Sequence, residues 1–455
     1  MSNMEEEQFD QAFGEHTGIS DSCRSCIGEI KNNDGSPDKF VLYPSDAHQF
    51  TDKSWRLLGQ YVANNTYLRI IDVSDCGLTD EKMALFFGQL VKSSSSELDI
   101  RNNIRTSGIE SARSMIPFLE NSPNLSRLYF CNNVFNTECF ELLIGALNGK
   151  SVQEMHFDRC SITDISALDR YNLPSLQDLT LRGNYVGCVG CRTLANLLQK
   201  EGSKLRYLDI EVVGIGNEGV KILADSLKHN TVLRTLYLKG NNISERGYLV
   251  LLKLLNDISS IGNTYNSNNT LRKIDFGQKD QRLNSENGEL IINHIDSIRQ
   301  IHSGYTSNGQ YLTSHAIGRA KVIECQLNSQ NRKKMCHLQG VEYSAEDNML
   351  AGIEPKLLPK ILALIGERHG QSEFYTSLWP VAPDLLSFID RKAMIIDEKT
   401  RTADQMKELS RQLAALADKD DQLNSRLALI ELGDSKQAET MAGGKKISGE
   451  KRQRI

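Results

Sequence analysis

Two kinds of segment are missing from this chain of 455 residues: a hydrophobic run of membrane-spanning length and a secretory leader. No segment approaches the ~20 apolar residues that a helix needs to cross a bilayer. The first sixteen residues carry five acidic side chains and no Lys or Arg, and they lack the apolar stretch of a signal peptide. These absences predict a soluble, cytoplasmic protein without a membrane partner.

An excess of positive charge is also missing. The chain has 53 Lys and Arg against 58 Asp and Glu, a formal net charge of −5. A nucleic-acid-binding protein usually carries a basic patch or stripe, so no nucleic-acid partner is predicted. The chain does end in a short basic cluster, formed by Lys445, Lys446, Lys451, Arg452 and Arg454. Nuclear import through this cluster is an alternative to cytoplasmic residence.

Signature motifs of common enzymes are absent as well. The sequence has no GxxxxGKS/T phosphate loop, no HExxH, no GxSxG and no kinase motif. A switch driven by nucleotide hydrolysis is therefore excluded. We expect a protein that is not an enzyme and needs no cofactor.

The chain is instead built on one repeated motif, LxxLxLxxN followed by a helical stretch. Its clearest copies are LSRLYFCNN, LQDLTLRGN, LRYLDIEVV and LRTLYLKGN. The repeats start at Leu68, Ser95, Leu125, Val152, Leu176, Leu205, Leu233 and Leu271. Repeats of this period indicate a solenoid, in which each unit packs on its neighbours.

The two halves of each repeat predict a strand and a helix. Leucines alternate with polar residues at period two, as in a strand with one buried face, and Val220, Leu223 and Leu227 show the helical spacing that follows. The predicted fold class is α/β: a leucine-rich repeat solenoid shaped as a horseshoe, with parallel strands on the concave side and helices on the convex side. A C-terminal helical region and a coiled coil complete it. The short fourth repeat predicts only a helical turn, and residues 256–270 predict a loop.

The residue that ends each motif is expected to form a buried turn. A small polar side chain there can bond exposed backbone groups, and this position holds Cys76, Asn103, Asn133, Cys160, Asn184 and Asn241. The sixth repeat has Val213 instead, so we expect its turn to be less well satisfied.

The predicted boundaries divide the chain into seven parts. They are a disordered acidic segment (1–35), an N-terminal capping repeat (36–66), the repeat domain (67–301), a linker (302–312), a helical capping region (313–392), a coiled coil (400–432) and a disordered basic tail (433–455). The region 313–392 is expected to cover the open end of the core, with a separate docking role as the alternative.

Outward-facing strand residues form the predicted partner-binding site. Alternate residues of a strand project to the same side, and strands lie about 4.7–4.9 Å apart, so these side chains should form continuous rows. The predicted site comprises Asp72, Asp99, Arg101, Tyr129, His156, Asp158, Arg182, Asp209, Glu211, Tyr237 and Lys239. Aromatic residues and Arg are enriched at interface hot spots, which favours a protein or peptide partner.

His156 and two cysteine pairs admit a chemical interpretation. Glu154, His156 and Asp158 project to one side of a strand, where a metal or acid–base site is an alternative to a polar contact surface. The CxxC pairs Cys23/Cys26 and Cys188/Cys191 suggest zinc, but Cys191 aligns with Val220, a core position. We therefore expect structural cysteines and no metal.

A heptad pattern predicts a coiled coil near the C-terminus. Apolar residues step by three and four along Met406, Leu409, Leu413, Leu416, Leu423, Leu427 and Ile430, with Asp420 in the one polar position. A single exposed helix of this length is marginal in water. The pattern predicts self-association as a dimer, with folding back onto residues 313–392 as the alternative.

The repeats resemble the ribonuclease-inhibitor class of leucine-rich proteins, through LxxLxLxxN followed by segments such as GVKILADSL. The chain also resembles a large family of leucine-rich repeat proteins in diatoms, through NTECFELLIGALNGKSVQEMHF, LPSLQDLTLRGN and IEPKLLPKILALIGERHGQSEFYTSL. The second resemblance extends from about residue 40 to the end. Both imply a horseshoe fold and protein–protein interaction.

The sequence thus predicts a non-enzymatic scaffold that binds a protein on its concave face and dimerises through the coiled coil. One alternative is an accessory regulator of an enzyme, such as a Ran-type GTPase-activating protein, although the basic tail differs from the acidic tail of that class. Another is an enzyme centred on His156.

Overall fold

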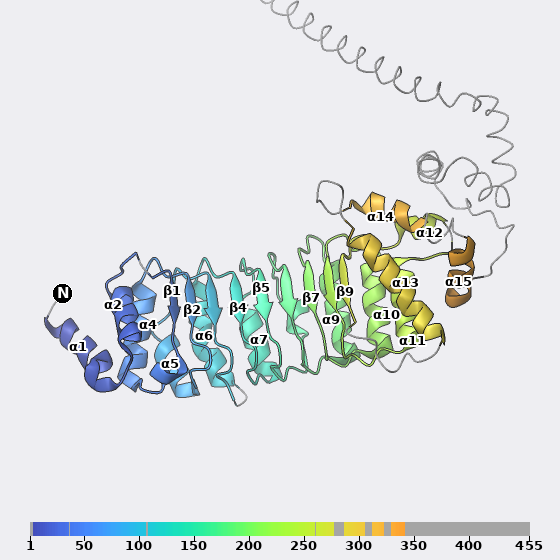
Figure 1. Cartoon of the computed structure of the whole chain (residues 1–455). Coiled ribbons are helices and arrows are strands. Elements are labelled where there is room, and N and C mark those ends of the chain that lie inside the picture. The colour runs from blue at the N-terminus through green and yellow to red at the C-terminus, as the bar shows by residue number, and fades with distance from the viewer. Residues whose placement is uncertain are drawn as a thin grey trace, which may run out of the picture. The chain divides into compact units, whose positions relative to one another are not determined.

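The computed structural model of the chain describes residues 3–35, 37–105, 108–259, 261–276, 286–304, 312–322 and 329–341. These residues contain one sheet of nine parallel strands, ordered along the sheet as they are in the sequence. The strands are β1 (Lys39–Val41), β2 (Ile70–Asp72), β3 (Glu97–Asp99), β4 (Arg127–Tyr129), β5 (Glu154–His156), β6 (Asp178–Thr180), β7 (Tyr207–Asp209), β8 (Thr235–Tyr237) and β9 (Lys273–Asp275). Figure 1 shows this row as an open solenoid of leucine-rich repeats, as predicted.

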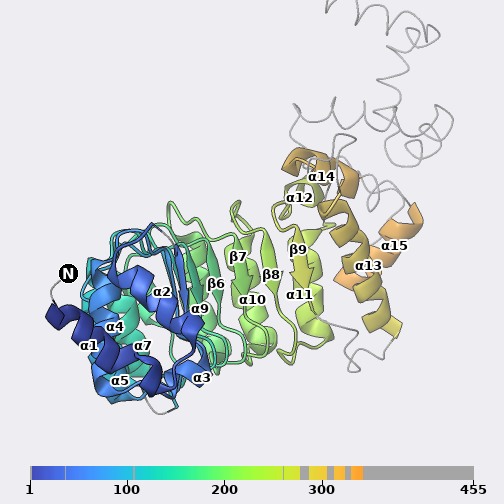
Figure 2. The same cartoon turned by 60° about the vertical axis from the view of Figure 1, so that its left-hand side comes forward.

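Helices connect consecutive strands. They are α3 (Pro44–Ala47), α4 (Asp52–Asn64), α5 (Asp80–Phe87), α6 (Ile109–Asn121), α7 (Thr137–Ala146), α8 (Ala167–Arg170), α9 (Gly187–Gln199), α10 (Gly216–Leu227) and α11 (Glu245–Leu255). From α4 to α11 each helix packs on the next one along one face of the sheet (Figures 1 and 2). We refer to the other face of the sheet as the strand face. The fourth repeat has only α8, which is four residues long, as its short sequence predicted.

The leucines of the repeat motif form the core between sheet and helices. Leu128, Leu179 and Leu208 are 0 % exposed and Leu236 is 1 % exposed. In the middle of the core the rings of Phe130 and Phe157 stack with centroids 5.0 Å apart. Burying one such side chain stabilises the fold by about 1.5–3 kcal/mol, so the burial pattern accounts for the strand register.

Asparagines at the end of the motif bond the turns, as predicted. Asn103, Asn133, Asn184 and Asn241 each donate from Nδ2 to a backbone carbonyl of their own repeat and to one of the repeat before. The turn at Val213 is less well satisfied than the others, as expected. Asn241 bonds it as each motif asparagine bonds the repeat before, accepting from the Val213 N–H at 3.0 Å and donating from Nδ2 to the Ile210 carbonyl at 2.6 Å. The Ile100 carbonyl accepts from both Asn103 and Asn133, whereas Val213 has no side-chain donor for the Ile210 carbonyl.

The predicted disorder of residues 1–35 is also wrong. Residues 3–35 form α1 (Asn3–Phe13), the turn η1 (Glu15–Thr17) and α2 (Asp21–Lys31). Phe13 and Ile27 are fully buried in the same core as Trp55. The reason is that the apolar residues of these helices, although few, recur every three or four positions and share one face. The two helices therefore cover the N-terminal end of the core.

Between α11 and β9 lies one further helix, α12 (Ile261–Asn266), where the sequence predicted a loop. After β9 follow α13 (Glu286–His302), α14 (Ser314–Lys321) and α15 (Ser329–Gln339). Ile291, Ile295 and Ile298 of α13 are buried against the core. The fully buried ammonium of Lys321 donates to the Leu255 carbonyl at 2.6 Å, at the C-terminal end of α11, and to Ser267 Oγ at 2.9 Å.

Several predictions concern other parts of the chain. The coiled coil (400–432), the tail (433–455) and residues 342–392 of the capping region lie outside the described residues. Within the described ranges, none of the helices combines the length and the apolar character that crossing a bilayer requires.

Candidate binding surface on the sheet

Strand pairing brings the predicted site residues together on the strand face. The central row runs, from strand to strand, through Asp72, Asp99, Tyr129, His156, Thr180, Asp209, Tyr237 and Asp275. The outer row, two residues further along each strand, is Ser74, Arg101, Cys131, Asp158, Arg182, Glu211 and Lys239. This is the arrangement that the period-two alternation predicted.

A third row was not included in the predicted site. It precedes the central row by two residues and consists of Glu97, Arg127, Glu154, Asp178, Tyr207, Thr235 and Lys273. The same alternation could have identified it, because residues two apart on a strand share a face. Arg127 Nε donates to Glu97 Oε2 at 2.8 Å within this inner row.

An ion pair joins the outer and central rows at β3. Arg101 donates from Nε and Nη2 to the Asp99 carboxylate at 2.9 and 2.6 Å, and Asp99 is only 5 % exposed. The Asp99 carboxylate and its hydrogen bond keep the pKa of Arg101 above its ordinary value. The Arg101 guanidinium also lies 6.0 Å from the centroid of the Tyr129 ring. The pair is therefore fixed in place beside the first aromatic residue of the central row.

Tyr129 and His156 stack in the middle of the strand face. Their ring centroids are 4.7 Å apart with an interplanar angle of 26°. Tyr129 Oη donates to Glu154 Oε2 at 3.4 Å, and His156 Nδ1 lies 3.4 Å from Thr180 Oγ1. Burial, together with Glu97 and Glu154, raises the pKa of Tyr129 to about 12. Burial lowers the pKa of His156 despite the neighbouring Asp158 and Glu154.

Beyond His156, the strand face carries a cluster of partly buried carboxylates. Arg182 donates its backbone N–H to Asp158 Oδ1 at 3.2 Å, and its guanidinium pairs with Glu211 at 3.4 Å. Glu211 in turn donates its backbone N–H to Asp209 Oδ1 at 3.0 Å. Burial raises the pKa of Asp209 to about 6, and the negative charges of Glu211 and Asp158 add to the effect. Asp209 and Glu211, predicted to face solvent, are 8 % and 6 % exposed, because adjacent strands pack these side chains against one another.

Two tyrosines mark the C-terminal end of the strand face. The rings of Tyr207 and Tyr237 lie 5.4 Å apart. Lys273 Nζ donates to Tyr237 Oη at 2.5 Å and sits 4.6 Å from the centroid of that ring. Lys239 is exposed in the outer row, and at the other end Asp72 is half-buried and accepts from Ser74 Oγ at 2.7 Å.

The ring of His156 faces Tyr129, and within the described residues no group of three His, Cys, Asp or Glu side chains is placed to hold a metal ion. The cysteines occupy mainly structural positions: Cys191 is fully buried on α9, and burial raises the pKa of Cys23 and of Cys191 to about 12. Cys188 is exposed and Cys26 is half-buried.

The predicted dimer residues, Met406 to Ile430, lie outside the described residues.

Comparisons with known proteins agree with this architecture. A family model described as "Leucine Rich repeat" matches residues 64–81 and 229–251. The chain is 28 % identical over 201 residues to ribonuclease inhibitor of Sus scrofa, covering 42 % of this chain and 43 % of the relative. It is 24 % identical over 206 residues to ribonuclease inhibitor of Mus musculus, covering 42 % of this chain and 44 % of that relative.

A third match is shorter. Protein CARMIL of Dictyostelium discoideum is 38 % identical over 68 residues, covering 14 % of this chain and 6 % of the relative. The chain thus spans less than half of the length of each of these curated relatives. Together the matches support a leucine-rich repeat protein similar to ribonuclease inhibitor.

Proposed function

We propose that this chain is a non-enzymatic scaffold that binds a protein or peptide partner on its strand face. The observation that carries the proposal is the ordered strand face, where Tyr129 and His156 stack and the rings of Tyr207 and Tyr237 lie in contact. Tyr129, His156 and Tyr237 are each held by a side-chain hydrogen bond with a neighbouring strand. Side chains that are already fixed lose little conformational freedom when a partner binds. Aromatic residues in such positions are the usual hot spots of interfaces.

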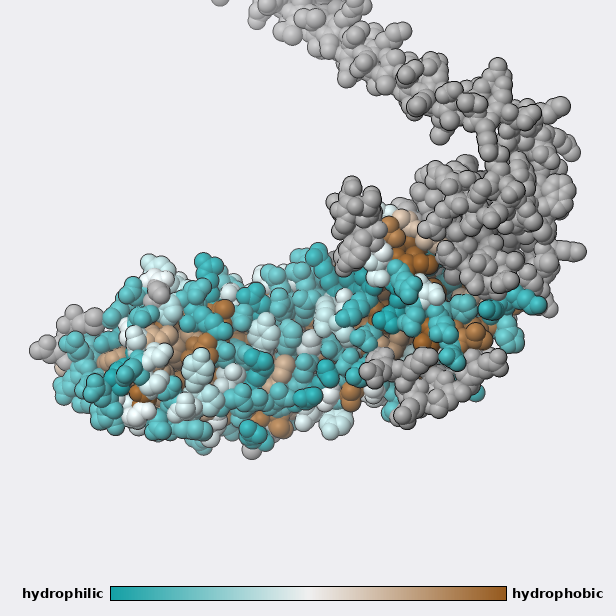
Figure 3. Space-filling view, in the orientation of Figure 1, coloured by the Kyte–Doolittle hydropathy of each residue, from teal (hydrophilic) through white to brown (hydrophobic). Residues whose placement is uncertain are grey.

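The surface chemistry fits a protein partner better than a small molecule. The visible surface over the middle of the solenoid is mostly hydrophilic, while hydrophobic surface gathers near α12 and α14 (Figure 3). The three rows together mix both charges with a few aromatic residues, which matches the composition of a non-obligate interface. The similar ribonuclease inhibitors are named for a protein target, which supports the same use of the repeats here.

An enzyme centred on His156 is less well supported. A general base must reach the proton it abstracts, and His156 has one ring face against Tyr129 and Nδ1 beside Thr180. Its lowered pKa follows from burial, which favours the neutral imidazole. These contacts hold the ring as part of a recognition surface. The alternative as a GTPase regulator has no feature of the described residues in its favour.

Self-association through residues 400–432 completes the proposal. Its support is the heptad spacing of seven apolar residues, from Met406 to Ile430. We further propose a cytoplasmic location, with nuclear import through the basic tail as the alternative. The resemblance to the diatom repeat proteins reaches into this C-terminal third and supports treating it as part of one scaffold.

The proposal is tested with a partner that has been identified by affinity capture and purified. Tyr129→Ala and Tyr237→Ala should each weaken its binding about thirtyfold to a few hundredfold, since truncating an aromatic hot spot costs about 2 kcal/mol or more. Lys221→Ala and Lys228→Ala on the helical side serve as controls and should change affinity less than about threefold. A larger loss from the α10 variants than from the strand-face variants would place the partner on the helices instead.

A further inference from the structure

Basic residues are concentrated where the strand face ends. The second position of the repeat is Arg206, Arg234 and Arg272 in the last three repeats, whereas the four repeats before them have Ser96, Ser126, Gln153 and Gln177. These arginines are adjacent in space, because the backbone N–H of Arg234 donates to the Arg206 carbonyl at 2.8 Å and that of Arg272 to the Arg234 carbonyl at 2.7 Å. They form a row along the edge of the sheet at which the strands begin.

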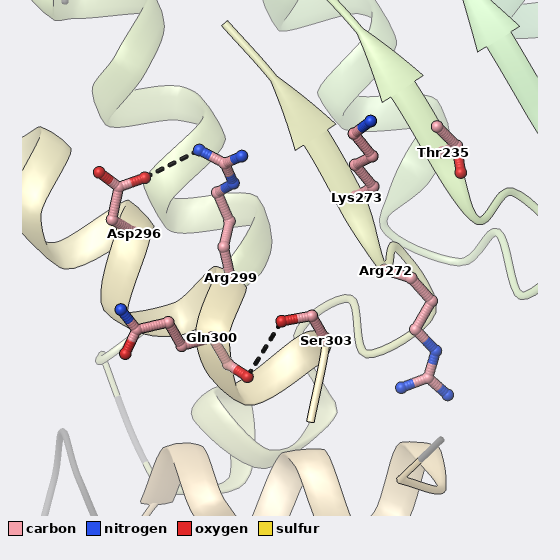
Figure 4. A pocket seen from close by; sticks show the side chains of 7 residues that line it. All are labelled: Thr235, Arg272, Lys273, Asp296, Arg299, Gln300 and Ser303. Carbon is pink, nitrogen blue, oxygen red and sulfur yellow. Dashed lines mark hydrogen bonds and ion pairs between the residues drawn. The ribbon is translucent and has the colours of Figure 1, made fainter. Parts of the chain in front are cut away.

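This row leads into a cavity of about 510 Å³ between β9 and α13 (Figure 4). The cavity is lined by Thr235, Arg272, Lys273, Asp296, Arg299, Gln300 and Ser303. Of these seven side chains three are cationic and one is acidic. We refer to Arg206, Arg234, Arg272, Lys273 and Arg299 as the basic corner.

Two of the cations come from opposite walls of the cavity, β9 and α13. Figure 4 shows Lys273 on the strand and Arg299 on the helix, with their charged ends directed to the same side of the cavity. They are close enough for the positive charge of Arg299 to oppose protonation of Lys273, although the hydrogen bond to Tyr237 keeps the pKa of Lys273 raised. Arg299 donates from Nη1 to Asp296 at 2.8 Å, and the carboxylate of Asp275 favours the charged form of Lys273. Because Lys273 and Arg299 carry like charges close together, binding of an anionic group between them is favourable.

Arg272 has a structural role. Its guanidinium donates to the His302 carbonyl at 3.1 Å and the Leu312 carbonyl at 2.6 Å, away from the other two cations (Figure 4). These bonds connect β9 to the end of α13 and to the segment after it. Arg272 therefore holds the wall of the cavity in place. Lys273 and Arg299 can meet a ligand beside their bonds to Tyr237 and Asp296, and the exposed Arg234 and Arg206 extend the row.

We propose that the basic corner binds an acidic peptide segment of the partner, with one carboxylate between Lys273 and Arg299 and others along Arg234 and Arg206. This proposal rests on the strand-face function proposed above and specifies the chemistry of the partner. Three adjacent strands span about 10 Å, which is the length of about three residues of extended peptide. Two acidic side chains about three residues apart would thus reach the two ends of the row. Tyr207 and Tyr237 beside it supply apolar surface for the residues between.

The experiment measures fluorescence anisotropy with the full chain and a labelled peptide that carries glutamate at every third position. A peptide with glutamine in those places is the ligand control. Binding should depend on the glutamates and should weaken between about 50 and about 200 mM salt, as expected of exposed charges. Lys273→Gln with Arg299→Gln should weaken binding roughly five- to thirtyfold, since each exposed ion pair contributes modestly. Arg206→Gln with Arg234→Gln tests the row independently with a similar expectation.

The matched control removes two charges from α10, by Lys221→Gln with Lys228→Gln, and should leave peptide affinity within about twofold. Equal binding of the glutamate and glutamine peptides, or equal losses in the control and the basic-corner variants, would overturn the proposal. Tighter binding of a single-stranded RNA oligonucleotide, lost in the same variants, would assign the corner to nucleic acid and also overturn it.

Failure of this proposal is distinguishable from failure of the strand-face function. If the purified partner is lost with Tyr129→Ala but is unaffected by the basic-corner variants, the strand face binds it and the acidic anchor is wrong. If the peptide requires the basic corner while Tyr129→Ala leaves partner binding unchanged, the basic corner is a binding site for acidic peptides and the wider strand-face function is wrong.

Discussion

Asn184→Ala is the substitution whose effect can be worked out most fully from the structure. Asn184 is 2 % exposed and makes four hydrogen bonds to backbone groups. Nδ2 donates to the Phe157 and Leu181 carbonyls, both at 2.7 Å, and Oδ1 accepts from the N–H groups of Cys160 and Ile162, both at 3.0 Å. Alanine leaves all four groups without this partner.

The magnitude follows from the number of bonds. A hydrogen bond contributes about 0.5–1.5 kcal/mol net, so four give about 2–6 kcal/mol. Water that enters the vacated space can recover part of this loss. We therefore expect the free energy of unfolding to fall by about 2–4 kcal/mol, measured by urea denaturation followed by circular dichroism. Asn196→Ala is the control, because Asn196 makes an exposed bond to Asp169 at 2.9 Å, and it should cost less than about 0.5 kcal/mol.

Amide hydrogen exchange shows at which residues the Asn184→Ala substitution lowers stability. The amides of Cys160 and Ile162 should lose protection in Asn184→Ala, while those of β2 and β3 should not, since each repeat of a solenoid contacts only its neighbours. A loss of stability below about 0.5 kcal/mol with unchanged exchange at Cys160 and Ile162 would refute the assignment of the turn to these bonds.

Three further predictions concern the core, pH and assembly. Leu179→Ala should lower the free energy of unfolding by about 2–5 kcal/mol in a urea titration, because it leaves a cavity at a fully buried site; a loss below about 1 kcal/mol would show that the core there is loosely packed. Asp209→Asn should stabilise the protein by about 1 kcal/mol near pH 7.5 and not near pH 4. Burial raises the pKa of Asp209 from 3.8 to about 6, so the folded state retains a proton that the unfolded state has lost, and stability falls as pH rises through this window. Equal effects of Asp209→Asn at both pH values would contradict that origin. A chain that ends at Lys392 should sediment as a monomer at micromolar concentration and the full chain as a dimer; monomers in both cases would assign the heptad pattern to a different partner.

The repeat motif was sufficient to predict the fold and the register of the central row. Its leucines must enter the core, and a shift of one residue would turn each of them to solvent, so Tyr129, His156 and Thr180 had to lie side by side. The same rule would have placed Glu97, Arg127 and Tyr207 on the inner row. What the motif does not report is how deeply these side chains are packed, which is why the burial of Asp99 and Asp209 was not predicted.

The two ends of the solenoid were predicted less well for a different reason. Acidic composition obscured the apolar spacing of Phe9, Phe13 and Ile27, so residues 3–35 were taken for disordered. The cavity between β9 and α13 joins Lys273 to Arg299, which are not related by the repeat. Its position depends on how Ile291, Ile295 and Ile298 dock on the core, and no local pattern in the sequence specifies that.

The most direct test of a partner-binding strand face is site-specific photo-crosslinking in the presence of the purified partner. A photoreactive phenylalanine derivative replaces Tyr129 in one protein and Lys221, on the helical side, in another. We predict a covalent adduct with the partner from position 129 and none from position 221. An adduct from position 221 alone would show that the partner binds the helices and would contradict the central claim.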